Sequence, residues 1–335
     1  MNHAGPGLDH RHERLGHYSL DELRAPSLGP RSLVLEDGPV LRDRDTQLGL
    51  WILYELAYRG FEDVDPAREW DPVIVAMRST IERRLEHELR ESVSAVLADA
   101  PDHDDVGDQV LAMARENSGP RLSSYLRRDA DAEQMRDYLR ERSVQQLKES
   151  DPQSFLLPRL AGAAKVALAE LQYDEYGAGR PDRLHQALYA RALHAAGLDP
   201  AYGAYVGEIS AISLAAANVM SLFALNRRLV GAAVGHLAAF EATSALPSRM
   251  VASGIERLGL GVEVAAYFHE HVEADAVHEQ VAAREICGAY VSEDPTRWRD
   301  VLFGAACLLY LDGLFGADLL ARWESAVDPT TGVAS

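Results

Sequence analysis

Two histidines and an aspartate recur along one face of a predicted helix in the segment YFHEHVEADAVHEQVAAREI. At about 100° per residue, His271, Asp275 and His278 fall within roughly 60° of one another. Imidazole nitrogens and carboxylate oxygens together suit iron, manganese or zinc. The same three residues also fit an exposed polar face, because other acidic residues flank them. This segment alone therefore leaves a metal site and a solvated helix face open.

A second pair of potential ligands, Glu175 and His185, stands on either side of a break in the helical pattern. Gly177, Gly179 and Pro181 lie between them. An unbroken helix would point the two side chains in different directions, whereas two glycines and a proline allow a helix to end and restart. The break predicts that both side chains can meet at one point. The alternative is a glycine-capped helix end, followed by a new helix that carries a polar histidine.

Two further carboxylates interrupt apolar helix faces. Glu241 stands in LVGAAVGHLAAFEATSALPSRM, and Glu55 stands in DTQLGLWILYELAYRGF. A buried, ionised carboxylate is costly unless it is paired, protonated or bound to metal. For Glu55 the alternative is a salt bridge to Arg59 or another internal arginine. His236 lies five residues before Glu241, so we expect it to pack in the core or to contact the ligands without binding the metal itself.

The elements that must position these residues are predicted to be helices. From Asp45 onward nearly every apolar segment has helical spacing, and no convincing period-two strand pair interrupts it. We therefore expect an all-α fold, with short connections that favour a compact bundle. We divide the chain into a lead-in segment (1–44) and a helical domain (45–330). Within that domain, the polar block 61–150 is predicted to be an inserted, partly exposed helical subdomain.

Composition excludes several classes of protein. The 335 residues are 47% apolar and 25% charged, which is enough to bury a core. Acidic residues outnumber basic ones by 52 to 33, so the net charge of -19 disfavours binding to nucleic acid. Cys287 and Cys307 are the only cysteines, which excludes a disulfide framework within the chain.

We also expect a soluble, cytoplasmic protein that does not bind a membrane. The N-terminal segment lacks the basic start and apolar stretch of a secretory signal. The least polar run, Ile209 to Leu225, contains three serines and an asparagine and is predicted to be a buried core helix.

The order of the candidate ligands resembles that of the haem-oxygenase-like diiron oxidases and oxygenases, the iron-containing redox enzymes. The shared pattern is an apolar helix with one Glu, then Glu-x9-His, a lone Glu, and His-x3-Asp-x2-His. It covers about residues 45–320, interrupted by the 61–150 block, and implies a haem-oxygenase-like helical bundle. Carried over position by position, the resemblance implies seven metal ligands: Glu55, Glu175, His185, Glu241, His271, Asp275 and His278. Family members usually offer six ligands, and seven are typical of some N-oxygenases.

The resemblance implies an oxygenase or oxidase with two Fe²⁺ ions and dioxygen as co-substrate. The four carboxylates would neutralise two ferrous ions. A small metabolite would then be oxidised by N-oxygenation of an amine or by C–H or C–C oxidation, as part of specialised metabolism, with an external electron donor. Arg59 is a candidate for binding a substrate carboxylate, and Tyr58 and Tyr176 for shaping the pocket.

Other functions stay open at this point. One is a non-catalytic helical protein that binds metal or a small ligand, and another is a mononuclear or dimanganese enzyme that uses some of the ligands. A ferritin-like centre should show Glu-x-x-His on two helices. The chain offers only Asp182-x-x-His185 and Asp275-x-x-His278. The sequence also leaves a homodimer open.

Overall fold

The computed structural model describes residues 14–15, 18–19, 38–98, 100, 105–117 and 122–327. Helices dominate this part of the chain, so the predicted all-α fold is confirmed. The described strands are two residues each: β1 (Arg14–Leu15) and β2 (Tyr18–Ser19) pair antiparallel outside the bundle. Most of the predicted lead-in segment lies outside the described residues.

Several helices in the first half of the chain begin at aspartate caps. The side chains of Asp43, Asp71, Asp105 and Asp131 each accept a hydrogen bond from a backbone N–H of the first turn that follows. The helices are α2 (Arg44–Glu55), η1 (Pro66–Trp70), α3 (Pro72–Ser92), α4 (Ser94–Ala98), α5 (Val106–Glu116), α6 (Leu122–Arg128), α7 (Ala132–Gln146), α8 (Asp151–Ser154) and η2 (Leu157–Arg159).

The second half contains the longest described helix, α16. Its helices are α9 (Gly162–Glu175), η3 (Pro181–Arg183), α10 (His185–Ala195), α11 (Ala211–Leu225), η4 (Arg227–Leu229), α12 (Val230–Ala242), α13 (Ala245–Leu258), α14 (Val262–Gln280), the π-helix η5 (Val281–Gly288), α15 (Ala289–Glu293), η6 (Pro295–Arg297) and α16 (Trp298–Val327). The sequence predicts a pair of helices at the end of the chain, whereas α16 is one helix. Burial of its apolar face compensates for the low helix propensity of Gly313 and Gly316.

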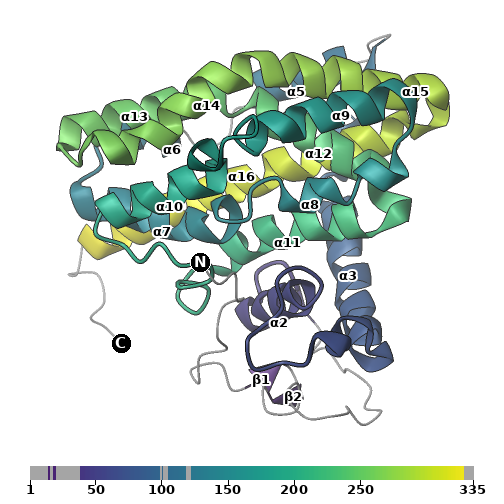
Figure 1. Ribbon diagram of the computed structural model, residues 1–335, viewed down its shortest axis with the longest axis horizontal. Coiled ribbons are helices and arrows are strands. Elements are labelled where there is room, and N and C mark those ends of the chain that lie inside the picture. Colours follow the sequence, from purple (N-terminus) through teal and green to yellow (C-terminus); the bar gives the residue numbers. More distant parts are fainter. Residues whose placement is uncertain are drawn as a thin grey trace.

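The long helices form a layered bundle (Figure 1). In this view α13 and α14 run across the top, α12 and α16 through the middle, and α10, α7 and α11 below them. Helix α12 packs along α16, α13 along α14, and α2 against α11. Helices of the 61–150 block also contact this bundle: α5 packs against η5, α12 and α16, α6 packs against α13, and α7 packs against α10 and α11. The division into a domain and an insertion stays a prediction.

Two glycines allow α12 and α16 to lie unusually close. A Cβ atom on Gly235 would overlap the backbone carbonyl of Val301, and one on Gly304 would overlap the carbonyl of Ala232. Each helix therefore supplies a glycine where the backbone of the other approaches. This contact fixes the position of α12, which carries Glu241.

Among the described residues, α16 is long and apolar enough to cross a membrane, and α12 with α13 passes the same test as a pair bent by 46°. Within the apolar window of the α16 segment, 67% is buried inside the structure, which is what a core helix also shows. Helix α11, in the apolar run of the sequence, is shorter and almost entirely buried, as predicted for a core helix.

Candidate metal centre

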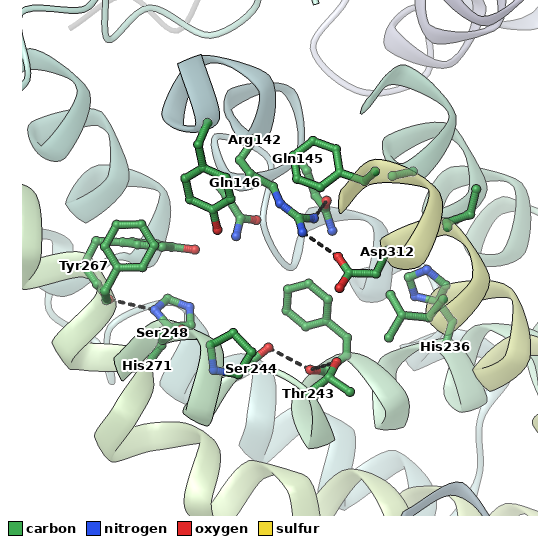
Figure 2. Close-up of a pocket in the computed structure, with 18 residues that line it drawn as sticks. Arg142, Gln145, Gln146, His236, Thr243, Ser244, Ser248, Tyr267, His271 and Asp312 are labelled. Atoms are coloured by element: carbon green, nitrogen blue, oxygen red, sulfur yellow. Dashed lines mark hydrogen bonds and ion pairs between the residues drawn. The ribbon is translucent and has the colours of Figure 1, made fainter. Parts of the chain in front are cut away.

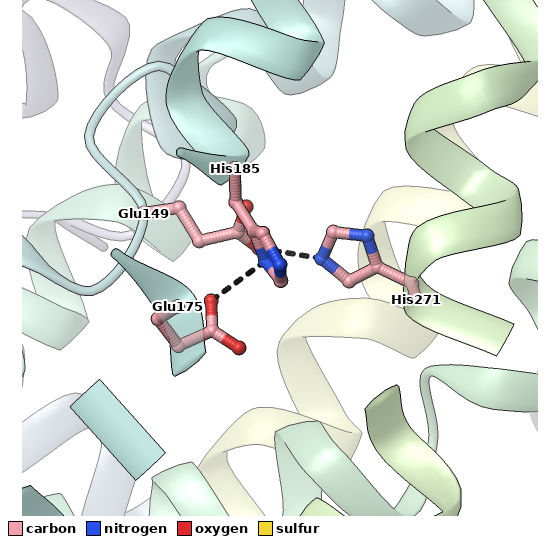
Figure 3. Close-up of side chains that lie close together, drawn as sticks. All are labelled: Glu149, Glu175, His185 and His271. Atoms are coloured by element: carbon pink, nitrogen blue, oxygen red, sulfur yellow. Dashed lines mark hydrogen bonds and ion pairs between the residues drawn. The ribbon is translucent and has the colours of Figure 1, made fainter. Parts of the chain in front are cut away.

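Six buried side chains from separate segments converge in two groups that share Glu175. The first group is Glu149, Glu175, His185 and His271, and the second is Glu175, Glu241 and His278. Within each group the potential ligand atoms all lie within 4.8 Å of one another. None of the six residues is more than 5% exposed. Figure 3 shows that the members of the first group point toward one another from different parts of the bundle.

The break between α9 and α10 brings Glu175 and His185 together. Helix α9 ends at Glu175, and α10 begins at His185. Between them Gly177 and Gly179 have φ angles of 77° and 79°, in the left-handed region that favours glycine. A Cβ atom on Gly177 would also overlap the carbonyl of Arg180. As a result, Nδ1 of His185 lies 2.9 Å from Oε2 of Glu175.

His271 presents one ring nitrogen to Glu149. Its Nδ1 lies 2.9 Å from the carbonyl oxygen of Tyr267, which can only accept, so Nδ1 carries a proton. Its Nε2 lies 3.3 Å from Oε1 of Glu149. The Tyr267 hydroxyl donates to Oε2 of the same carboxylate at 3.0 Å. A neutral imidazole would thus place a lone pair beside a carboxylate, which is unfavourable unless a cation lies between them.

His278 lies between the two remaining carboxylates. Its Nδ1 is 3.3 Å from Oε1 of Glu175 and 3.6 Å from Oε2 of Glu241. Its Nε2 is 3.5 Å from Oδ2 of Asp174, a half-exposed residue. The imidazole of His278 therefore contacts both the carboxylates of the second group and Asp174 at the surface.

The charges of the two groups depend on one another. Burial raises the pKa of Glu175, but its contacts with His185 and His278 outweigh burial and hold that pKa well below its ordinary value. Burial lowers the pKa of His278, whereas Glu175 and Glu241 raise it to about 11. Burial also raises the pKa of Glu241. Without metal, protons on the imidazoles balance the carboxylates, and a metal cation would replace those protons.

Glu149 is the member of the two groups that the sequence analysis did not identify as a candidate ligand. It follows the C-terminal end of α7, in the 61–150 block that we expected to be a partly exposed insertion. The next residue, Ser150, has a φ of 67°, and its hydroxyl donates to Oε2 of Glu175 at 3.1 Å. One signal was present: polar residues recur at three- and four-residue steps from Arg142 through Gln145 to Glu149.

The structure does not bring Glu55 into either group. Glu55 is fully buried at the end of α2, where its Oε2 accepts a hydrogen bond from the Tyr202 hydroxyl at 2.7 Å. Nζ of Lys148 lies 3.5 Å from the same oxygen. The alternative of an internal salt bridge therefore describes Glu55, with a lysine in place of the expected arginine. Glu149, and not Glu55, lies beside the other candidate ligands among the described residues.

Asp275 lies in α14, but its side chain is outside the described residues, so its role as a ligand stays a prediction.

The three residues predicted to bind substrate all contact other parts of the fold. Arg59 bonds to Asp151 at 3.1 Å, the Tyr58 hydroxyl bonds to Ser221, and the Tyr176 hydroxyl bonds to Ser154. None of the three lines the cavity that reaches His271.

Two cavities reach the groups from different directions. One, of about 90 Å³, lies between α7, α14, α16 and the α12–α13 junction and is lined by His271 and Tyr267 (Figure 2). The other, of about 300 Å³, is lined by His185 and His278. Both polar and apolar side chains line the first cavity, whereas most of the side chains that line the second are charged groups or histidines.

The donor set fits iron. Carboxylate oxygens and imidazole nitrogens are the ligands of non-haem iron sites. The buried Nδ1 of His185 has no hydrogen-bond partner among the described residues, although it lies beside Glu175. That nitrogen is therefore available to a cation held by the same carboxylate.

Comparison with known proteins agrees with this chemistry. A family described as iron-containing redox enzymes, of the haem-oxygenase-like type, matches residues 136–313. The match covers more than half of the chain and includes both groups of candidate ligands. No curated protein matches the chain. With its all-helical bundle, the chain belongs to the haem-oxygenase-like family of iron-containing redox enzymes.

Proposed function

We propose that this oxidoreductase binds two iron ions and uses dioxygen to oxidise a small molecule. The observation that carries the proposal is the position of Glu175 between the two groups. Its Oε2 faces His185 in the first group at 2.9 Å, and its Oε1 faces His278 in the second at 3.3 Å. A carboxylate with one oxygen toward each group is suited to bridge two metal ions spaced about 3.5–4 Å apart.

The remaining residues divide between two ions. Glu149, His185 and His271 would hold one, and Glu241 and His278 the other. With Glu175, the described carboxylates supply three negative charges, and Asp275, the predicted additional ligand, would supply a fourth. Two ferrous ions would then give a neutral centre, which is the charge that a buried site favours.

Two ferrous ions, when bound, supply the electrons that activate dioxygen. The chain itself fixes the ligands and excludes bulk water. Tyr267 contributes in two ways, since its carbonyl orients His271 and its hydroxyl orients Glu149. The oxidised position of the small molecule would be an amine nitrogen or a carbon atom, and an external electron donor would return the centre to its reduced form.

The test is iron loading followed by rapid mixing with oxygen. Protein loaded with Fe²⁺ under anaerobic conditions should hold two irons per chain and show a transient charge-transfer absorption when oxygen is added. Glu149→Gln should reduce the iron content from two to about one and abolish the transient. Glu55→Gln is the matched control, since it alters a buried carboxylate outside both groups, and it should keep two irons.

Two results would contradict the proposal. If Glu55→Gln lost iron while Glu149→Gln kept both ions, the assignment of the ligands would be wrong. If the protein bound iron but gave no reaction with oxygen, a non-catalytic metal-binding protein would be the better description.

A further inference from the structure

The inner cavity that reaches His271 adjoins a larger outer cavity. The outer one, of about 550 Å³, lies between α6, the start of α13 and the middle of α16. The two cavities share the lining residues Tyr138, Arg142, Thr243, Pro247 and Asp312. Arg142 on α7 and Asp312 on α16 therefore lie at the boundary between the outer cavity and the cavity that reaches His271.

Arg142 and Asp312 form an ion pair at this boundary (Figure 2). Nη2 of Arg142 lies 2.5 Å from Oδ1 of Asp312. The guanidinium also lies over the ring of Phe315, 4.1 Å from its centroid, and Nη1 donates to Oε1 of Gln145 at 3.4 Å. The Arg142 side chain is only 18% exposed, whereas that of Asp312 is 48% exposed. One fixed positive charge and one more accessible negative charge thus stand side by side at the cavity wall.

We propose that Arg142 and Asp312 bind a substrate head group that carries a positive and a negative charge next to each other, while the apolar remainder of the substrate extends through the inner cavity toward His271. The identity of this ligand as the substrate rests on the function proposed above. The pair is neutral as a whole. A head group with a single charge would leave one of the two partners uncompensated, whereas a dipolar head replaces both interactions.

Part of the inner cavity's lining is apolar and can contact an apolar chain. Phe240, Leu308 and Leu311 belong to this part. Gln146 lines it as well, and its buried Oε1 has no hydrogen-bond partner among the described residues. One donor group along an otherwise apolar chain would satisfy that oxygen.

The spacing along α7 sets the distance between the head group and the metal centre. Arg142 lies four residues before the last residue of α7, which is about 6 Å along the axis at a rise of 1.5 Å per residue, and Glu149 follows in the turn beyond the end of the helix. The end of the substrate presented to the metal centre is therefore remote from the charged head. This orientation favours oxidation at a distant carbon over N-oxygenation of the head-group amine.

Calorimetry on the metal-free protein tests the head-group site. The probes are α-amino acids with unbranched apolar side chains, from 2-aminopentanoate to 2-aminooctanoate, and the matched carboxylic acids and amines that lack one charge. The amino acids should bind at least about tenfold more tightly than either matched series. Arg142→Gln and Asp312→Asn should each weaken that binding by at least about tenfold. Asp312→Asn preserves shape at a half-exposed position, so it reports on binding even if Arg142→Gln fails to fold.

Arg284→Gln is the matched control. Arg284 forms a 2.6 Å ion pair with Asp108 between η5 and α5, and neither residue lines the inner or the outer cavity. This variant should bind the amino acids as the unmodified protein does. The proposal is overturned if no probe binds with a Kd below about 10 mM, if an acid or amine alone binds as tightly as the amino acid, or if Arg284→Gln weakens binding as much as Asp312→Asn.

Relaxation measurements test the orientation. In protein loaded with Mn²⁺, the terminal methyl protons of the bound amino acid should relax faster than its α-proton, because the methyl end lies nearer the metal. Faster relaxation of the α-proton would overturn the orientation. Failure to bind any metal would count against the proposed function, whereas the calorimetric result on metal-free protein would be unaffected, so the two failures can be told apart.

Discussion

Replacement of His236 should make the protein more resistant to acid. This residue lies on α12 with only 4% of its surface exposed, its ring edge-to-face with Phe223. Burial lowers its pKa from 6.5 to about 4, so the folded protein holds the imidazole neutral. The unfolded chain binds a proton below pH 6.5. The contribution of His236 to stability is thus fully present above pH 6.5 and is lost as the pH falls toward 4. At about 1.4 kcal/mol per pH unit, the loss reaches about 2 kcal/mol at pH 5.

Urea unfolding of the metal-free protein at pH 7.5 and pH 5.0 measures this effect. His236→Leu removes the titrating group and keeps an apolar side chain in the cavity wall. The free energy of unfolding of the variant, relative to the unmodified protein, should rise by about 2 kcal/mol between the two pH values. His87→Gln, which alters an exposed histidine on α3, should show no comparable change. If the difference for His236→Leu were the same at both pH values, His236 would not be neutral and desolvated in the fold, and the reasoning would be refuted.

Two further predictions concern packing and buried charge, both measured by urea unfolding at pH 7.5. Lys148→Met should lower the free energy of unfolding by about 3–5 kcal/mol, because Glu55 would stay buried with only the Tyr202 hydroxyl as partner. Glu55→Gln should lower the free energy of unfolding by less than Lys148→Met does, because burial already lowers the pKa of Lys148 and so favours its neutral form. An equal or larger loss would contradict this. Gly235→Ala should lower the free energy of unfolding by about 3 kcal/mol, because its Cβ would overlap the carbonyl of Val301, and an unchanged value would show that α12 and α16 can separate freely.

Local patterns in the sequence were sufficient to predict the helices and part of the candidate metal centre. Helical periodicity predicted the all-α fold, because an apolar face with this spacing can be buried only as a helix. The glycines and proline after Glu175 predicted that it could meet His185, and the structure places them 2.9 Å apart. The spacing of His271 and His278 likewise put two imidazoles on one face of α14. In each of these cases, the residues that decide the geometry are close together in the chain.

Glu149 and Glu55 show where a single sequence is insufficient. An apolar helix face predicted that Glu55 is buried, and it is. Burial requires a partner but does not identify it, and here the partner is Lys148, which is 93 residues away in the chain. Glu149 does not lie on an apolar helix face, because it is in a turn that follows a polar helix. Its partners are Tyr267 and His271 on α14 and Gln186 on α10, which are distant in the chain, so the local pattern does not contain them.

The turn after α7 explains how a non-helical segment can hold a candidate metal ligand in place. Three successive side chains leave it toward different partners: Lys148 toward Glu55 on α2, Glu149 toward His271 on α14, and Ser150 toward Glu175 at the end of α9. The left-handed conformation of Ser150, with φ of 67°, reverses the chain at this point. Each contact is buried, so rotation of one side chain would leave a polar atom unsatisfied at another. Glu55, which the sequence pattern put forward as a ligand, therefore contacts through Lys148 the turn that carries Glu149, a member of the candidate metal-binding groups.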